Sequence, residues 1–167
     1  MGFGYEHVKR LLDRYVEMLE QVFGEKLVSV ALFGSVARGE AEAGSDIDLL
    51  IVAEGLPEDL GSRFDLVSNA RWKLRSTEEY EELRRRDLPR HTSEVILTPE
   101  EVQRHPPILL DLTEDAVIIY DRGGFLAREL ELLRSKLREM GAKRVKTGKG
   151  WYWMLKPDAK PGEVIEV

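Results

Sequence analysis

The stretch FGSVARGEAEAGSDIDLLIV, residues 33–52, closes one apolar run and opens a second. The apolar residues before Gly34 predict a buried strand over residues 27–33, and the Gly34-Ser35 step breaks it into a turn with exposed backbone N–H groups. Such donors, followed by the start of a short helix, suit an anionic phosphate. A second strand is predicted over residues 46–52, in which Asp46 and Asp48 share one face, roughly 7 Å apart along the strand.

The aspartate pair indicates a metal site. Two neighbouring carboxylates repel each other unless a cation joins them, and Mg²⁺ binds one or two carboxylates and completes its shell with water and phosphate oxygens. A solvated strand edge is the alternative for Asp46 and Asp48. The preceding Gly34-Ser35 turn and the apolar residues 49–52 favour the site, because acids within an apolar strand break its pattern. A Walker A loop is excluded, since Ser45 stands where its lysine would be and a strand follows.

The motif resembles the active-site signature of the DNA polymerase beta-like nucleotidyltransferases, and most closely that of the minimal nucleotidyltransferases of prokaryotes. The family pattern is Gly-Ser, a spacer with Arg and Gly, then Ser-Asp-x-Asp. The matching positions, in order and at family spacing, are Gly34, Ser35, Arg38, Gly39, Ser45, Asp46 and Asp48. Many members carry Arg directly after Gly-Ser, where this chain has Val36. The resemblance is specific over residues 27–55 and weaker up to about residue 100.

The resemblance implies an α/β (α+β) fold with a mixed, partly antiparallel sheet flanked by helices. It also implies transfer of a nucleoside monophosphate, most simply AMP from ATP, to an acceptor hydroxyl. In that chemistry Asp46 and Asp48 hold two Mg²⁺ ions, and Gly34, Ser35, Arg38 and Ser45 bind the nucleotide.

The family places a third carboxylate on the strand that returns beside the Asp-x-Asp strand. Glu94 is the acid at that place, at the start of a strand predicted over residues 93–97, so Glu94 is the expected third catalytic acid and metal ligand. An exposed glutamate at a strand end is the alternative. Asp65 is a weaker candidate, because it falls inside a helical pattern.

Periodicity predicts the remaining elements. Helices are expected over residues 5–23 and 125–140, a strand over residues 116–120 and a hairpin around residues 147–150. We expect a nucleotidyltransferase domain over residues 1–122 and a C-terminal extension over residues 123–167 packed on it. The leucines at 126, 130, 133 and 137 form a stripe that serves the core or, alternatively, a homodimer face. Trp151 and Trp153 are expected to pack on one face of the hairpin, with binding of a nucleotide or RNA end as the alternative.

Composition narrows the function classes. The chain has 167 residues and no cysteine, which excludes disulfides and thiol chemistry. Its net charge of −6 argues against broad nucleic-acid binding, which needs a basic surface. The sequence has no run of about 18 apolar residues and no N-terminal secretion signal, so we expect a cytoplasmic protein without a membrane segment.

The acceptor is the open question. Minimal nucleotidyltransferases resemble the antitoxins of two-gene systems, which transfer AMP to a helical HEPN-domain partner, so the resemblance implies a HEPN-type partner for this chain. The alternatives are a small-molecule nucleotidyltransferase and a catalytically silent module that binds nucleotide or partner.

Overall fold

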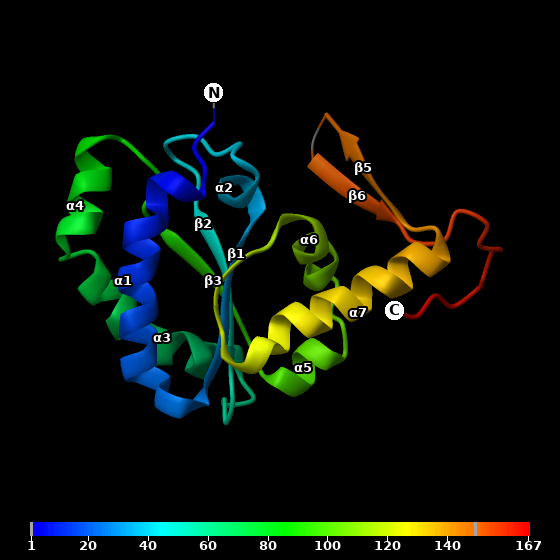
Figure 1. Ribbon diagram of the computed structural model, residues 1–167, viewed down its shortest axis with the longest axis horizontal. Coiled ribbons are helices and arrows are strands. Elements are labelled where there is room, and N and C mark those ends of the chain that lie inside the picture. The colour runs from blue at the N-terminus through cyan, green and yellow to red at the C-terminus, as the bar shows by residue number, and fades with distance from the viewer. Residues whose placement is uncertain (1, 149) are drawn as a thin grey trace.

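The computed structural model describes residues 2–148 and 150–167 and shows a sheet between two groups of helices (Figure 1). The helices are α1 (Tyr5–Phe23), α2 (Gly34–Arg38), α3 (Leu60–Leu74), α4 (Glu78–Arg85), α5 (Pro99–Gln103), α6 (Ile108–Asp115) and α7 (Phe125–Met140). The strands are β1 (Leu27–Phe33), β2 (Ile47–Ala53), β3 (Thr92–Leu97), β4 (Val117–Asp121), β5 (Lys143–Thr147) and β6 (Gly150–Met154). Two 3₁₀ turns, η1 (Gly24–Lys26) and η2 (Arg122–Gly124), precede β1 and α7.

The main sheet has four strands in the order β3-β2-β1-β4. β1 is antiparallel to both β2 and β4, whereas β2 is parallel to β3. The predicted mixed, partly antiparallel sheet flanked by helices is therefore confirmed. Two register pairs place the residues of the predicted site. Phe33 of β1 lies opposite Asp48 of β2, and Leu49 of β2 lies opposite Glu94 of β3.

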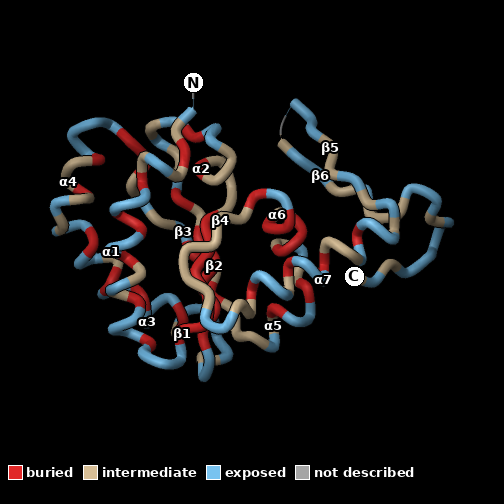
Figure 2. The backbone as a smooth tube through the Cα atoms, viewed as in Figure 1, coloured by how far each residue is buried: buried red, intermediate tan, exposed pale blue. Residues whose placement is uncertain are grey.

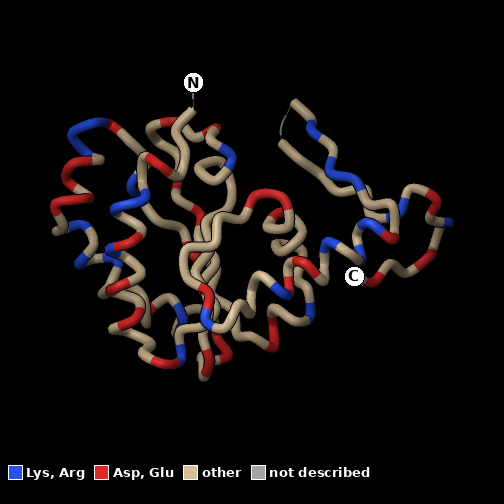
Figure 3. The backbone as a smooth tube through the Cα atoms, viewed as in Figure 1, with Lys and Arg blue, Asp and Glu red and all other residues tan. Residues whose placement is uncertain are grey.

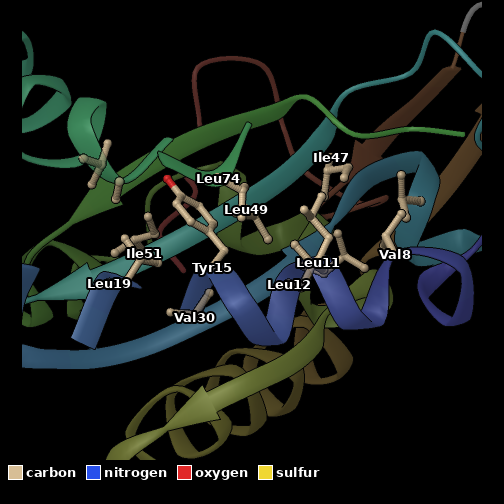
Figure 4. Packing of buried hydrophobic residues seen from close by; sticks show 14 of the residues in the cluster. Val8, Leu11, Leu12, Tyr15, Leu19, Val30, Ile47, Leu49, Ile51 and Leu74 are labelled. Atoms are coloured by element: carbon tan, nitrogen blue, oxygen red, sulfur yellow. The ribbon is translucent and has the colours of Figure 1, made fainter. Parts of the chain in front are cut away.

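One face of the sheet is covered by α1, α3 and α4. The apolar stripe of α1 packs on alternate residues of β2, and Figure 4 shows Tyr15 and Leu19 beside Leu49 and Ile51. Alternation along a strand sends Leu49 and Ile51 to this face and their neighbours to the other. The helix predicted over residues 5–23 is confirmed as α1.

The opposite face is covered by α5, α6 and α7, and its buried residues include Leu50 and Val52 of β2. Most buried positions of both clusters lie at the sheet and on the inner sides of these helices (Figure 2). The predicted leucine stripe of α7 is buried in this cluster through Leu126, Leu130, Leu133 and Leu137. The expectation that these leucines belong to the core is therefore confirmed, and the alternative that they form a homodimer face is wrong.

The strands β5 and β6 form a separate antiparallel hairpin beyond α7 (Figure 1). Trp153 packs against the second core cluster and donates a hydrogen bond from Nε1 to Asp111 at 3.0 Å. Trp151 remains 37% exposed, and the Arg144 guanidinium lies 4.4 Å from the centre of one of its rings. Alternation places both tryptophans on one face, but the packing prediction holds for Trp153 alone. The predicted turn includes Lys149, which lies outside the described residues.

In the described part of the chain, no helix combines the length and the apolar character needed to cross a bilayer. The division between residues 122 and 123 stays a prediction.

Candidate active site

The two halves of the motif meet at Gly34 and Asp48. β1 ends at Phe33 and α2 begins at Gly34, so the turn lies directly beside the start of β2. Gly34 has φ +75°, and a Cβ atom at this position would lie 2.3 Å from Oδ2 of Asp48. Glycine is therefore needed at position 34 both for its backbone conformation and for the space that the carboxylate occupies.

The aspartate pair is electrostatically strained without a cation. Asp46 is exposed in the loop before β2, whereas Asp48 is partly buried near the start of the strand. Burial, and then the negative charge of Asp46, raise the pKa of the Asp48 carboxyl, while Arg38 acts in the opposite direction. A cation that binds both carboxylates would relieve both costs.

Ser45 shapes the loop that presents Asp46. Its Oγ accepts a hydrogen bond from the backbone N–H of Glu42 at 2.9 Å, and its own N–H donates to the Glu42 carbonyl at 3.0 Å. The hydroxyl proton of Ser45 stays available as a donor to a ligand. In this structure Ser45 closes the turn immediately before the aspartate pair.

The donor set fits Mg²⁺. Asp46 and Asp48 supply hard carboxylate oxygens, and Mg²⁺ uses one or two carboxylates together with water and substrate phosphates. The residues that the structure describes contain no cluster of three or more acidic or histidine side chains placed to hold a metal. A metal ion held by Asp46 and Asp48 would take its remaining ligands from water or from substrate phosphates.

The structure does not place Glu94 with the aspartate pair, and this corrects the prediction that Glu94 is the third catalytic acid and metal ligand. The parallel register sets Glu94 beside Leu49, which puts it on the face of α1 and α3 rather than on the face of Asp48. Its carboxylate accepts a hydrogen bond from the Tyr15 hydroxyl at 2.8 Å and pairs with Arg71. The alternative of an exposed strand-end glutamate is also wrong, because the Glu94 side chain is fully buried.

The environment of Glu94 is a structural ion pair. Burial, followed by the charge of Glu94, raises the pKa of the Tyr15 phenol far above its usual range, so this hydroxyl stays protonated and donates. Burial tends to lower the pKa of Arg71, but the charge and hydrogen bond of Glu94 outweigh it and raise the pKa. These contacts tie α1, α3 and β3 together.

Neither of the two other positions that the sequence singled out joins the site. Asp65 is exposed on α3, which packs on the face opposite Asp48. Val36 is fully buried in the first core cluster. The side chain that stands in place of the family's arginine therefore contributes to packing and not to phosphate binding.

Arg38 lies close to the site but is held by acids. Its Nε donates to Glu40 at 2.9 Å, and its Nη1 donates to Asp115 at 2.9 Å. Asp115 is 4% exposed at its side chain and also accepts two hydrogen bonds from Arg144, at 2.7 and 2.9 Å. Asp115 thus joins α2, α6 and β5. Lys and Arg residues recur along β5 (Figure 3).

Sequence reasoning missed Asp115 and Arg144. The one signal in the sequence for Asp115 is weak: it is an acid at the end of the apolar helix α6, and a carboxylate that is buried there needs a partner. The partner itself is separated from Asp115 by 29 residues, and nothing in the local pattern identifies it.

Comparison with known proteins defines the class. Residues 12–119 match the nucleotidyltransferase domain family. A protein of Methanocaldococcus jannaschii named "Putative protein adenylyltransferase" is 29% identical over 146 residues, which cover 86% of this chain and 92% of that protein.

Two solved structures are also similar. One is a crystal structure of a "putative nucleotidyltransferase from Sulfolobus solfataricus", with 27% identity, a TM-score of 0.45 and coverage of 74% of this chain and 94% of the other. The other is a tri-AMPylated Shewanella oneidensis HEPN toxin in complex with MNT antitoxin, with 15% identity, a TM-score of 0.43 and coverage of 80% and 92%.

The chain belongs to the nucleotidyltransferase domain family, because the family match spans most of its length and includes the whole of the Gly-Ser and Asp-x-Asp motif. It is a nucleotidyltransferase.

Proposed function

We propose that this protein transfers AMP from ATP to a hydroxyl group of a partner protein, with Asp46 and Asp48 as the metal-binding carboxylates. The observation that carries the proposal is the contact between the two halves of the motif, where the Asp48 carboxylate fills the space beside Gly34. A phosphate held at the Gly34-Ser35 turn would lie next to the carboxylates, which is the arrangement that phosphoryl and nucleotidyl transfer require.

The turn would hold the β- and γ-phosphates. The first backbone N–H groups of α2 have no partners within the helix, and the Ser35 hydroxyl adds a further donor. Arg38 would offset the phosphate charge at longer range, because Glu40 and Asp115 already hold its guanidinium. Ser45 would donate its hydroxyl proton to the nucleotide.

Mg²⁺ bound by Asp46 and Asp48 would supply the positive charge that stabilises the attacking oxygen and the leaving pyrophosphate. The half-buried position of Asp48 makes its carboxylate a stronger ligand than an exposed one, since burial disfavours the unpaired charge. Asp46, which is more exposed, would leave room for the acceptor.

The charge of the chain and the name of one relative support a protein acceptor. The net charge of −6 disfavours a nucleic-acid acceptor, and the M. jannaschii relative carries the name of a protein adenylyltransferase. We therefore favour a protein hydroxyl, and the family resemblance makes a HEPN-domain protein encoded by the neighbouring gene the first partner to test.

The experiment uses α-labelled ATP, Mg²⁺ and the purified product of the neighbouring gene. Wild-type protein should place label on the partner, whereas Asp48→Asn should lower labelling by at least about 100-fold, because the carboxylate acts on charge that develops during transfer. Asp65→Asn is the matched control, since it makes the same chemical change at an exposed position on α3. It should label the partner at the wild-type rate.

Two outcomes would refute the proposal. Equal labelling by wild type and Asp48→Asn would remove the carboxylate pair from the mechanism. Transfer of label to aminoglycosides or to RNA but not to the partner would reassign the acceptor while leaving the site intact.

A further inference from the structure

A surface cavity lies between α3, α4 and the segment that enters β3. Its volume is about 90 Å³. Its polar lining is formed by Arg71 of α3, Arg75 directly after α3, Tyr80 of α4, and Arg90, His91 and Thr92 at the entry to β3. Three arginines therefore converge on one small cavity in a chain whose net charge is negative.

The positive charge of this cavity is poorly balanced. No Asp or Glu belongs to its lining among the described residues. Within the same part of the chain, Arg75 and Arg90 form no ion pair, and Arg71 pairs with Glu94 through Nη2 alone. Like charges held close together raise the free energy of the folded state unless an anion joins them.

One polar atom of the lining also has no hydrogen-bond partner. The Nε atom of Arg71 is buried and has no partner among the described residues. An unsatisfied buried donor costs about 1–3 kcal/mol, and such atoms in a native protein call for a specific explanation. The Nε–H group of Arg71 can only donate, so its missing partner is an acceptor atom.

The cavity is too small for a nucleotide, because pockets for ligands of that size usually measure about 300–1,000 Å³. A single phosphate group matches it better, since arginine guanidinium groups bind phosphate oxygens through paired, charge-assisted hydrogen bonds.

The cavity is distinct from the metal-binding carboxylates yet close to them. Thr92 lies opposite Ile47 in the parallel register, and the Ile47 N–H donates to the His91 carbonyl at 2.8 Å. Ile47 separates Asp46 from Asp48 in sequence, so one strand spacing of about 4.8 Å joins the cavity rim to the start of β2. Glu94, beside the cavity, faces α1 and α3, whereas Asp48 faces the other way.

We infer that the cavity formed by Arg71, Arg75, Arg90 and Thr92 is a second ligand site that binds one phosphate group, either as inorganic phosphate or as a phosphomonoester. The site works without a metal, because its cations belong to the protein. It therefore stands independently of the function proposed for Asp46 and Asp48.

Calorimetric titration with inorganic phosphate in the presence of EDTA tests this inference. EDTA removes metal ions, so phosphate cannot bind through a metal held by Asp46 and Asp48. The wild-type protein should bind one phosphate per chain, and the double variant Arg75→Gln, Arg90→Gln should bind it at least about tenfold more weakly. The control is Arg84→Gln, Arg86→Gln, which changes the net charge equally at exposed positions of the α4 region. It should bind phosphate as the wild type does.

Further titrations identify the ligand and separate the two sites. Phenyl phosphate in place of inorganic phosphate shows whether a larger ligand can present the group, and acetate shows whether a carboxylate suffices. Asp48→Asn should keep phosphate binding in EDTA while losing Mg²⁺-dependent binding of an ATP analogue. Should the double variant fail to fold, Arg75→Gln alone serves, since Arg75 is exposed.

Three results would overturn the inference. They are no binding at millimolar phosphate, equal weakening by the two double variants, and acetate binding as tight as phosphate binding. Loss of nucleotide binding in Asp48→Asn with phosphate binding intact would support both sites.

Discussion

Replacing Gly34 with alanine would separate the stability of the fold from the chemistry of the site. A residue other than glycine at φ +75° costs about 1–2 kcal/mol. In addition, the new Cβ would lie 2.3 Å from Oδ2 of Asp48, while ordinary contact begins at 3.4 Å, so the carboxylate has to move by about 1 Å. The carboxylate is the end of a flexible side chain, and its displacement adds little to the loss of stability.

The expected result is a modest fall in melting temperature and a large fall in activity. A loss of about 1–2 kcal/mol lowers the melting temperature by about 2–8 °C in a chain of this size, whereas a catalytic group misplaced by about 1 Å can cost about 100-fold in rate. Gly39→Ala is the matched control, because Gly39 has φ +73° and no atom within 4 Å of the Cβ position.

Differential scanning fluorimetry and the labelled-ATP assay measure the two effects. Both variants should melt at similar temperatures, and only Gly34→Ala should lose about 100-fold in transfer. Equal activities of the two variants would refute the reasoning that Gly34 makes room for Asp48.

Three further predictions follow from the pKa shifts and ion pairs. The folded state holds the pKa of Asp48 above its usual 3.8, so between 3.8 and the raised pKa the folded chain binds more protons than the unfolded chain, and metal-free stability falls as pH rises through this range. Asp48→Asn should therefore melt no lower than wild type at pH 7 in EDTA. The Mg²⁺ affinity of the wild type, measured by calorimetry, should weaken as pH falls through the same range. Glu94→Gln should lower the free energy of unfolding in urea by about 1–3 kcal/mol, since it removes charged hydrogen bonds to Tyr15 and Arg71. Its transfer rate should stay within about threefold of wild type, whereas a loss of rate of about 100-fold at unchanged stability would return Glu94 to the active site. Asp115→Asn should weaken the contact that holds the β5–β6 hairpin through Arg144. A loss of about 2 kcal/mol of local stability would make trypsin cleave the hairpin about 30-fold faster, and unchanged cleavage would show that Asp115 does not hold it.

Several features of this protein could be predicted from the sequence because their causes are local. The stripe of α1, the apolar run of β1 and the turn at Gly34 depend on neighbours within a few residues. The helical spacing of the α1 stripe and the continuous apolar character of β1 are both visible in the sequence. The same holds for the Thr98–Glu101 capping box, which starts α5. The two-residue spacing of Asp46 and Asp48 is likewise visible in the sequence, although the strand begins at Ile47, one residue later than predicted, and Asp46 lies in the loop before it.

The position of Glu94 could not be predicted, because it depends on register between strands. A shift of one residue in the pairing of β3 with β2 would send Glu94 to the face of Asp48, and the sequence of β3 alone does not set that pairing. Tyr15 and Arg71, which hold Glu94, come from two helices distant in sequence.

By itself, the sequence determined the catalytic motif, the class of reaction and most helices and strands, since each depends on short-range pattern. Tertiary structure alone decided which acids share a face, that Asp115 joins Arg38 to Arg144, and that three arginines line one cavity. Those arrangements arise when distant segments pack together, and the free energy of burying or pairing their charges depends on partners that no local pattern specifies.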